Sequence, residues 1–387
     1  MSYKILTLNN ISVAGLDHFP RDRYEIASEI GHPDAILVRS HKMHDMEIPA
    51  SVLAIGRAGV GVNNIPVEAM SHRGVPVFNA PGANANAVKE LVLAGMLLAA
   101  RNLCQAWDLV RELEDSDGLD AQVEAAKKRY AGFELPGRTL GVLGLGAIGV
   151  EVANAALGLG MKVVDFDPQI TVDRARQLSP GAQQAASLGD LFRRSDIVTL
   201  HVPLVPETRG MVNAERIGMM KKDAVLLNFA RGGIVDEDAV LQALDEGKLH
   251  TYVCDFPSAH LKNHPRVIAL PHLGASTKEA EDNCAAMVVE NVMDYLENGN
   301  VRHSVNFPEA VMPRNGGCRL SIANANVPNM VGQISTSLAD ASLNIADLLN
   351  KSRGELAYTL VDLDAEVPAK TVEEIRAIEG VLSVRSI

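Results

Sequence analysis

Residues 139–149 read TLGVLGLGAIG, and this stretch decides the fold. An aliphatic run leads into the pattern G-x-G-x-x-G at Gly144, Gly146 and Gly149, and a helix-like segment follows. In a strand–turn–helix unit the first glycine allows a tight turn, and the second lets a pyrophosphate approach the backbone. The third permits close packing of helix on strand, and the helix N-terminus faces the anion. We therefore predict a dinucleotide-binding βαβ unit here.

An acidic residue at the end of the next predicted strand indicates which dinucleotide is bound. That strand is MKVVDFDP (161–168), and Asp167 stands near its end. A carboxylate at this point accepts hydrogen bonds from the ribose hydroxyls and repels a 2′-phosphate, so we predict NAD rather than NADP. Asp165 is the alternative carboxylate and ranks second because it lies within the predicted strand.

Strand-like and helix-like segments alternate on both sides of this unit. This βαβ rhythm predicts an α/β fold with two Rossmann-like, doubly wound parallel-sheet lobes. Helices are expected at about 87–113, ended by DSDGLD (115–120), and at about 277–296. The expected strands lie within 4–8, 35–40, 52–59 and 75–81, and then within 139–143, 161–168, 195–203, 223–233, 250–257 and 266–274.

The last part of the chain, 317–387, has a different pattern. Strand-like and helix-like segments follow one another in the order β-α-β-β-α-β, which is typical of a ferredoxin-like domain. The segment MPRNGG (312–317) precedes it and is expected to be a linker.

Composition excludes some classes of partner. The net charge of −12 gives no general attraction to nucleic acid. The longest apolar run, 91–100, is too short to span a bilayer, so no membrane partner is expected. The first ten residues, MSYKILTLNN, lack the apolar core of a secretory signal, and the four cysteines are scattered. We therefore expect a cytoplasmic protein with reduced thiols.

Several motifs together resemble the D-2-hydroxyacid dehydrogenase family, and within it the phosphoglycerate dehydrogenases that carry a C-terminal ACT domain. The resemblance covers almost the whole chain. It rests on IGRAGVGVNNIPVEA (55–69), VFNAPGANANAVKE (77–90), LGLGAIGVEVA (143–153), HVPLVPETRG (201–210), NFARGGIVDEDAVL (228–241) and PHLGAST (271–277).

The resemblance implies three domains and an activity. A substrate-binding (catalytic) domain would comprise 1–92 and 288–311, with an NAD-binding domain, 93–287, inserted into it. An ACT regulatory domain would comprise 317–387. The implied reaction is NAD-dependent oxidation of 3-phosphoglycerate (3-phospho-D-glycerate) to 3-phosphohydroxypyruvate, the first step of L-serine biosynthesis, in a homodimer or homotetramer.

The matched positions also imply residue roles. Arg231 corresponds to the arginine that binds the substrate carboxylate, since a guanidinium binds a carboxylate through two hydrogen bonds. His272 corresponds to the acid–base histidine, whose imidazole can exchange a proton near neutral pH. Asp255 corresponds to the aspartate that holds the nicotinamide carboxamide. The full set expected at the cofactor is Gly144, Gly146, Ala147, Ile148, Gly149, Asp167, His201, Pro203, Thr208, Ala230, Arg231, Asp255, His272 and Gly274.

A basic group of residues is expected to bind the substrate phosphate. Arg39, Ser40 and Arg57 match basic and hydroxyl positions of phosphoglycerate enzymes, and Lys42 is a further candidate. The basic run KKRY (127–130) either reaches a neighbouring subunit's site or is a solvated helix face. The full set expected at the substrate is Arg39, Ser40, Arg57, Val60, Gly61, Asn84, Arg231 and His272.

The chain departs from the family between Asp255 and His272. Relatives carry a glutamate there that hydrogen-bonds the catalytic histidine, whereas YVCDFPSAHLKNHP (252–265) contains none. His260 and His264 have the spacing H-x-x-x-H, but nearby prolines argue against the helix that would make them a metal pair. We expect loop residues and no metal site.

The ACT-like segment departs as well, since Asn329 stands where relatives usually have glycine. By position, Asn324, Asn326 and Asn344 are candidates to bind an amino-acid effector such as L-serine, and an oligomerisation module without a ligand is the alternative. Two other activities remain open for the whole chain. One is a dehydrogenase for glycerate, lactate or another 2-hydroxy acid, and the other is an NADH-sensing corepressor.

Overall fold

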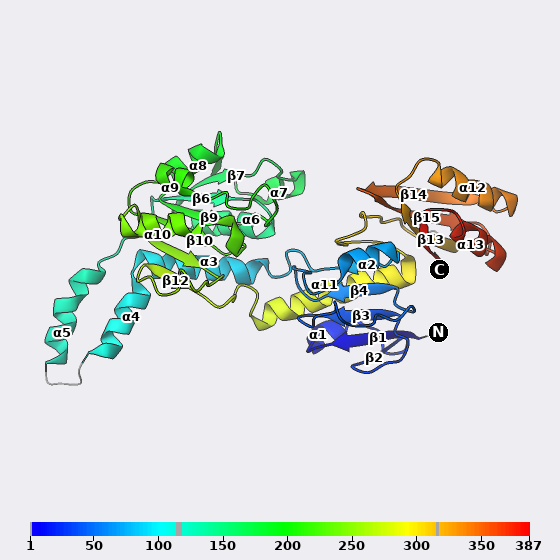
Figure 1. Ribbon diagram of the computed structural model, residues 1–387, viewed down its shortest axis with the longest axis horizontal. Coiled ribbons are helices and arrows are strands. Elements are labelled where there is room, and N and C mark those ends of the chain that lie inside the picture. The colour runs from blue at the N-terminus through cyan, green and yellow to red at the C-terminus, as the bar shows by residue number, and fades with distance from the viewer. Residues whose placement is uncertain (1, 114–117, 315–316) are drawn as a thin grey trace. The chain divides into compact units, whose positions relative to one another are not determined.

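The computed structural model describes residues 2–113, 118–314 and 317–387. It divides into two compact units, Met1–Ala83 with Lys278–Ile387, and Asn84–Thr277 (Figure 1). Part of the predicted helix break at 115–120 and part of the predicted linker at 312–317 lie outside the described residues. The domain boundaries predicted at 92/93 and 287/288 stay predictions.

The unit 84–277 contains a seven-stranded sheet in the order β12-β11-β10-β9-β6-β7-β8, paired in parallel throughout. This confirms a doubly wound sheet that starts at the glycine-rich strand. Its strands are β6 (Thr139–Leu143), β7 (Lys162–Phe166), β8 (Ala182–Gln184), β9 (Ile197–Leu200), β10 (Ala224–Asn228), β11 (Leu249–Cys254) and β12 (Val267–Ala269).

Helices cover both faces of this sheet because alternate strand residues point to opposite sides. In β10, Val225 and Leu227 pack with one set of helices, while Ala224 and Leu226 pack with the other. The first set is α3 (Ala85–Ala100) and α6 (Ala147–Gly158), and the second is α8 (Leu188–Arg194), α9 (Ala214–Met219) and α10 (Glu237–Asp245). The remaining elements are α4 (Leu103–Glu112), α5 (Leu119–Ala126), η1 (Lys127–Tyr130), α7 (Val172–Gln177) and η2 (Gly232–Ile234).

The single helix expected over about 87–113 is wrong. The structure has two helices there, α3 and α4, separated at Arg101 and Asn102. Asn102 adopts a left-handed conformation with φ 50°, which ends the regular helix. Asparagine visits this region more readily than most residues because its short polar side chain makes local hydrogen bonds.

The other unit begins with a five-stranded parallel sheet in the order β2-β1-β3-β4-β5. Helix α2 (Val67–His72) lies on one face, and α1 (Val13–Leu16) and α11 (Lys278–Asn298) lie on the other. The strands are β1 (Tyr3–Leu8), β2 (Tyr24–Ala27), β3 (Ala35–Val38), β4 (Ala54–Arg57) and β5 (Val77–Phe78). The sequence predicted all of them except β2.

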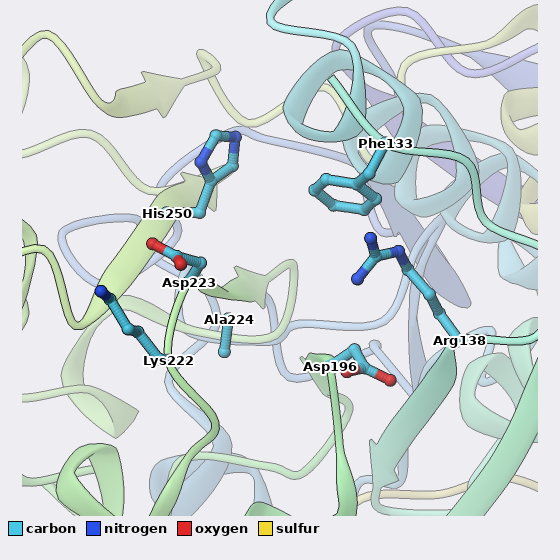
Figure 2. A pocket seen from close by; sticks show the side chains of 7 residues that line it. All are labelled: Phe133, Arg138, Asp196, Lys222, Asp223, Ala224 and His250. Carbon is cyan, nitrogen blue, oxygen red and sulfur yellow. The ribbon is translucent and has the colours of Figure 1, made fainter. Parts of the chain in front are cut away.

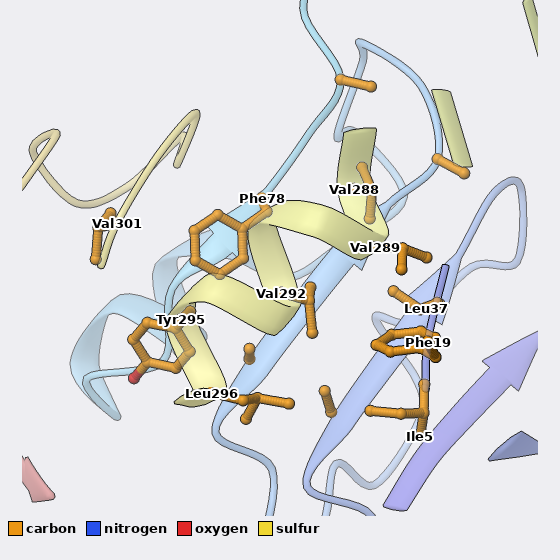
Figure 3. Packing of buried hydrophobic residues seen from close by; sticks show 14 of the residues in the cluster. Ile5, Phe19, Leu37, Phe78, Val288, Val289, Val292, Tyr295, Leu296 and Val301 are labelled. Atoms are coloured by element: carbon orange, nitrogen blue, oxygen red, sulfur yellow. The ribbon is translucent and has the colours of Figure 1, made fainter. Parts of the chain in front are cut away.

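Helix α11 is the element that returns the chain to the first sheet. Figure 3 shows its side chains Val288, Val292 and Tyr295 among buried residues of the sheet, such as Leu37 and Phe78. In the part of the chain that the structure describes, no helix is long and apolar enough to cross a membrane.

Residues 318–386 form the predicted ferredoxin-like fold. The sheet order β14-β15-β13-β16 is antiparallel, and two helices cover one face. Its elements are β13 (Cys318–Ala325), α12 (Met330–Asp340), β14 (Ile345–Arg353), β15 (Leu356–Leu363), α13 (Ala369–Arg376) and β16 (Val381–Ser386). Asn329 has φ 65°, so it stands at a left-handed position that suits glycine and, next best, asparagine.

The opposite face of this small sheet packs on the first sheet's core rather than facing water. Tyr358 and Leu360 belong to the same buried cluster as Phe78 and Tyr295. The Tyr358 hydroxyl also donates to the carbonyl of Gly299 at 2.7 Å, just beyond α11. The ferredoxin-like domain is therefore seated against the end of α11.

Candidate active site

The predicted cofactor and catalytic residues of the unit 84–277 follow the carboxyl ends of six neighbouring strands. In an open α/β sheet this edge is where ligands bind. The edge collects the turn after β6, Asp167 after β7, His201 after β9, Arg231 after β10, Asp255 after β11 and His272 after β12.

The turn after β6 has the geometry that a dinucleotide requires. Gly144 has φ 92°, and a Cβ there would lie 2.7 Å from the carbonyl oxygen of His201. A Cβ on Gly149 would lie 2.0 Å from the carbonyl oxygen of Gly144, so this glycine permits the close approach of α6. A Cβ on Gly146 would meet nothing within 4 Å, which leaves open space at the N-terminus of α6. Ala147 and Ile148 form the first turn of that helix.

Asp167 lies beside this turn. Its carboxylate accepts hydrogen bonds from the backbone N–H of Leu145 at 2.8 Å and of Gln169 at 2.9 Å. Asp165 lies inside β7 and is buried, and burial, followed by the nearby charge of Asp167, raises the pKa of Asp165. Asp167 is therefore the carboxylate at the edge of the sheet, while Asp165 lies within the strand.

The segment after β9 contributes His201, Pro203 and Thr208. Burial lowers the pKa of His201 to about 3, so its ring is neutral near pH 7, and it lies 2.9 Å from the Thr199 hydroxyl. The Thr208 hydroxyl donates to the carbonyl of Pro203 at 2.5 Å and accepts from the N–H of Val205 at 2.9 Å. These bonds hold the segment in a compact turn.

Arg231 follows β10 in a turn that a buried asparagine holds. The Asn228 amide donates to the carbonyl of Arg231 at 2.9 Å and accepts from the N–H of Ala230 at 3.2 Å. The Arg231 guanidinium is exposed and donates to the carbonyl of Ala230 at 2.6 Å. Sequence reasoning missed Asn228, although an amide at the end of a buried strand was a usable signal.

Asp255 fixes the segment that carries His272. It is 1% exposed, and its two carboxylate oxygens accept from the N–H groups of Leu273 at 2.7 Å and Gly274 at 2.8 Å. His272 has φ 58°, a conformation that costs a non-glycine residue about 1–3 kcal/mol. The two hydrogen bonds that Asp255 accepts from Leu273 and Gly274 stabilise this strained backbone and hold the imidazole at the edge of the sheet.

The neighbour of the His272 ring is an aromatic side chain. The Phe256 ring centroid lies 4.9 Å from that of His272, and the Arg231 guanidinium carbon lies 5.9 Å from the Phe256 centroid. Among the described residues, no carboxylate forms an ion pair with His272. Phe256, which sequence reasoning missed, is therefore the aromatic neighbour of the His272 ring.

The loop after Phe256 is attached to α10. Ser258 donates to Glu237 at 2.8 Å, His260 lies 2.8 Å from Asp238, and His264 lies 3.3 Å from Asp245. No group of three metal-binding side chains occurs within 2–113, 118–314 and 317–387. The two histidines therefore pair with acidic groups of α10 in this structure.

A cavity of about 240 Å³ lies at the amino edge of the same sheet, opposite the candidate site. Figure 2 shows its lining, in which the Arg138 guanidinium lies 4.1 Å from the ring centroid of Phe133. Its other lining residues are Asp196, Lys222, Asp223, Ala224 and His250, which stand at or near the starts of strands. None of the predicted site residues lines this cavity.

The residues expected to bind phosphate belong to the other unit and follow the ends of β3 and β4. Arg39 and Ser40 come after β3, and Arg57 ends β4. Arg57 donates through Nε to the carbonyl of Arg39 at 3.0 Å, which joins the two segments. The loop through Val60 and Gly61 is held by Asn79, whose amide donates to the Val60 carbonyl at 2.7 Å.

Asn84 stands at the start of α3 with an unsatisfied amide oxygen. Its Oδ1 is buried and has no hydrogen-bond partner among the described residues. A buried acceptor without a partner is uncommon in folded proteins and marks a place where a ligand or water can donate. The KKRY run forms η1, a short exposed 3₁₀ helix after α5.

The three asparagines proposed for an effector do not come together within this chain. Asn324 and Asn326 line a cavity of about 150 Å³ with Asn329, at the end of β13. Asn344 precedes β14, and β14 begins beside Leu363, which pairs with Cys318 at the other end of β13. Asn344 therefore lies at the opposite end of the small sheet.

Residues 93–274 match the family model described as the NAD-binding domain of D-isomer specific 2-hydroxyacid dehydrogenases. The chain is 32% identical to the D-3-phosphoglycerate dehydrogenase of Haemophilus influenzae, over 98% of the chain and 93% of that enzyme. The chain belongs to the D-2-hydroxyacid dehydrogenase family.

Two other members give the extent of the similarity. The D-3-phosphoglycerate dehydrogenase of Methanocaldococcus jannaschii is 36% identical over 88% of the chain, and the match spans only 63% of that longer enzyme. The structure of an NAD⁺-bound 3-phosphoglycerate dehydrogenase of Entamoeba histolytica superposes with a TM-score of 0.60 at 26% identity. This match covers 79% of the chain and 99% of that structure.

Family membership and the glycine turn agree on the cofactor. The chain is an NAD-dependent oxidoreductase, and the open space at Gly146 and the carboxylate of Asp167 fit a dinucleotide.

Proposed function

We propose that this dehydrogenase oxidises 3-phospho-D-glycerate to 3-phosphohydroxypyruvate, as the first step of L-serine biosynthesis. The observation that carries the proposal is the grouping of Arg231 and His272 around Phe256 at the edge of the NAD-binding sheet. A cation for a carboxylate and an acid–base group are the two functions that a 2-hydroxy acid oxidation requires of the protein. The similarity to D-3-phosphoglycerate dehydrogenases supports the choice of substrate.

Proton transfer and charge stabilisation are assigned to these two side chains. NAD, when bound, supplies the acceptor for the hydride that leaves C2. His272 takes the proton of the C2 hydroxyl as the carbonyl forms, and returns it in the reverse reaction. Arg231 donates hydrogen bonds to the substrate carboxylate and to the oxygen on C2, which stabilises the charge that develops there. Asp255 keeps the backbone after His272 in place.

Arg39, Ser40 and Arg57 are assigned the substrate phosphate, with Lys42 and the KKRY run as further basic groups. Two guanidinium groups on adjoining strand ends suit a phosphate, because each forms several charge-assisted hydrogen bonds. Val60, Gly61 and Asn84 are the other substrate residues in this proposal, and the orphaned oxygen of Asn84 supports a ligand there.

The decisive experiment is kcat/KM for a panel of 2-hydroxy and 2-keto acids with NAD(H) and NADP(H). We expect 3-phosphoglycerate with NAD to be the best pair. Arg39→Ala should raise the KM for 3-phosphoglycerate roughly tenfold or more, since a charge-assisted bond to phosphate contributes about 1.5–3 kcal/mol. The KM for unphosphorylated D-glycerate should barely change. A D-glycerate preference in wild type would favour the glycerate or lactate alternative, and absence of turnover with every pair would favour a corepressor.

We also propose a homodimer or homotetramer. Helix α4 has no buried residue, and its apolar side chains Leu103, Trp107 and Val110 share one face and are 45%, 62% and 53% exposed. An apolar helix face of this kind is typical of a protein–protein contact. A cytoplasmic location, with the four cysteines free, is part of the same proposal.

The ferredoxin-like domain is proposed to be an ACT regulatory domain. The cavity lined by Asn324 and Asn326 supports an amino-acid ligand such as L-serine, and the alternative is an oligomerisation module. Titration calorimetry with L-serine distinguishes the two, because only the first predicts heat of binding that Asn326→Ala removes.

A further inference from the structure

The arginine proposed to bind phosphate is already paired with a carboxylate. Arg39 Nη2 lies 2.6 Å from Oε1 of Glu281 in the first turn of α11. The hydrogen bond and charge of Glu281 raise the pKa of Arg39, and the bond from Arg39 lowers the pKa of Glu281. The two side chains are 32% and 41% exposed, so this ion pair is within reach of solvent and of a ligand.

Helix α11 cannot easily move Glu281 away from Arg39. A Cβ on Gly15 of α1 would lie 2.3 Å from the Cβ of Ala285, and one on Gly56 would lie 2.5 Å from Val288. The helix is therefore packed directly against backbone on two sides. Asp282, the next residue, accepts a hydrogen bond from Ser12. Any exchange of partner at Arg39 must therefore occur by rotation of the Glu281 or the Arg39 side chain.

We propose that Glu281 is a specificity-determining residue that competes with the substrate phosphate for Arg39. In the free enzyme the Glu281 carboxylate pairs with the Arg39 guanidinium, and a phosphate monoester displaces this carboxylate. This inference rests on the proposed function, since it takes the phosphorylated substrate from there. A carboxylate beside the phosphate site weakens binding, so affinity is set below what the arginines alone would give.

The competition depends on charge. A phosphate monoester carries about −1.5 to −2 at pH 7 and has three acceptor oxygens, so it outcompetes a single carboxylate for a guanidinium. An unphosphorylated hydroxy acid offers nothing at this position and leaves the Arg39–Glu281 pair intact. Glu281 therefore affects phosphorylated ligands and free phosphate, and has little effect on D-glycerate.

The test compares Glu281→Gln with Glu279→Gln. Glu279 lies in the same turn of α11 and is exposed, so its substitution removes the same charge without removing the partner of Arg39. We expect Glu281→Gln to lower the KM for 3-phosphoglycerate and the inhibition constant of inorganic phosphate roughly two- to fivefold, the range for a partly exposed ion pair. The KM for D-glycerate should stay within error of wild type. In Glu279→Gln, the KM for 3-phosphoglycerate and the inhibition constant of inorganic phosphate should also stay within error of wild type.

A double substitution separates competition from a merely structural effect. In the Arg39→Ala background, Glu281→Gln should have no further effect on phosphate affinity, because the shared partner is gone. Equal shifts in the two glutamate variants, or weaker phosphate binding in Glu281→Gln, would overturn the proposal. If wild type does not oxidise 3-phosphoglycerate, the proposed function fails. The affinity for inorganic phosphate, measured by calorimetry on wild type, Glu281→Gln and Glu279→Gln, still tests the competition.

Discussion

Two arginines of this chain, Arg319 and Arg231, are bonded in opposite ways. Arg319 on β13 is 0% exposed, and its Nε and Nη2 donate to the two oxygens of Asp362 at 2.5 and 2.8 Å. Its remaining N–H groups donate to the carbonyls of Asn298, Met312 and Pro313. Arg231 is exposed, and the one hydrogen bond that its guanidinium makes within the described residues runs to the carbonyl of the preceding residue.

The difference separates a structural cation from one available to a ligand. A guanidinium has five N–H donors, and those of Arg319 are all used, so Arg319 joins the ferredoxin-like sheet to α11 and the segment after it. Arg231 keeps most of its donors for solvent or substrate. Arg39 is intermediate between these two arginines in its bonding, because it forms an ion pair with a single carboxylate, that of Glu281. The number of satisfied donors, more than the residue type, indicates what each arginine does.

Removing Arg319 should produce the largest loss of stability. Arg319→Met leaves the buried carboxylate of Asp362 without its partner, which costs about 3–5 kcal/mol. We expect Tm to fall by roughly ten degrees or more, measured by calorimetry, with faster hydrogen exchange in β13 and β15. The exposed Arg353→Met on β14 is the control and should leave Tm nearly unchanged. A Tm close to wild type in Arg319→Met would contradict a structural role for this ion pair.

Replacing Arg231 should lower activity and leave stability nearly unchanged. Arg231→Gln removes the cation assigned to the substrate carboxylate, so kcat/KM should fall about 10²–10³-fold. The free energy of unfolding should change by no more than about 0.5 kcal/mol, as for other exposed positions. Arg193→Gln, an exposed arginine on α8 of the same unit, controls for loss of charge. Unchanged kcat/KM in Arg231→Gln would show that this open guanidinium does not bind substrate.

The sequence predicted the fold wherever strands were apolar. The buried strands β6, β9 and β10 were found, whereas β2 and β8 were missed. Both missed strands stand at the edge of their sheet, where one side has no neighbour and polar residues are tolerated, so their sequences lack the hydrophobic signal. The break at Asn102 was missed because the helical pattern continues across it.

Site residues could be located from the sequence where they follow a strand. His272 and Asp255 could be placed at the sheet edge in this way. The backbone strain of His272 could not be predicted, because it depends on the hydrogen bonds that Leu273 and Gly274 donate to Asp255. The contact of Phe256 with His272 and the pair of Arg39 with Glu281 also depend on packing between separate elements. Such contacts have no signature in the order of residues.

The comparison of buried and exposed charged groups extends to His201, whose substitution is expected to have the smallest effect of the three. An unperturbed histidine has a pKa of about 6.5, and burial lowers the pKa of His201 to about 3. Between pH 6.5 and 3 the unfolded chain therefore binds a proton at this residue that the folded chain does not. Stability contributed by the neutral ring is present above about pH 6.5 and is lost as pH falls toward 3.

His201→Gln should accordingly reduce the loss of Tm on acidification from pH 7 to pH 4. Because the His201 side chain is not fully enclosed, we expect a difference from wild type of roughly one to three degrees. Other groups titrate in the same range, and comparison with the exposed His44→Gln removes their contribution, since that control should follow the wild-type curve. Parallel curves for all three proteins would mean that His201 takes up its proton in the folded state, and the ring would then belong with the open groups such as Arg231.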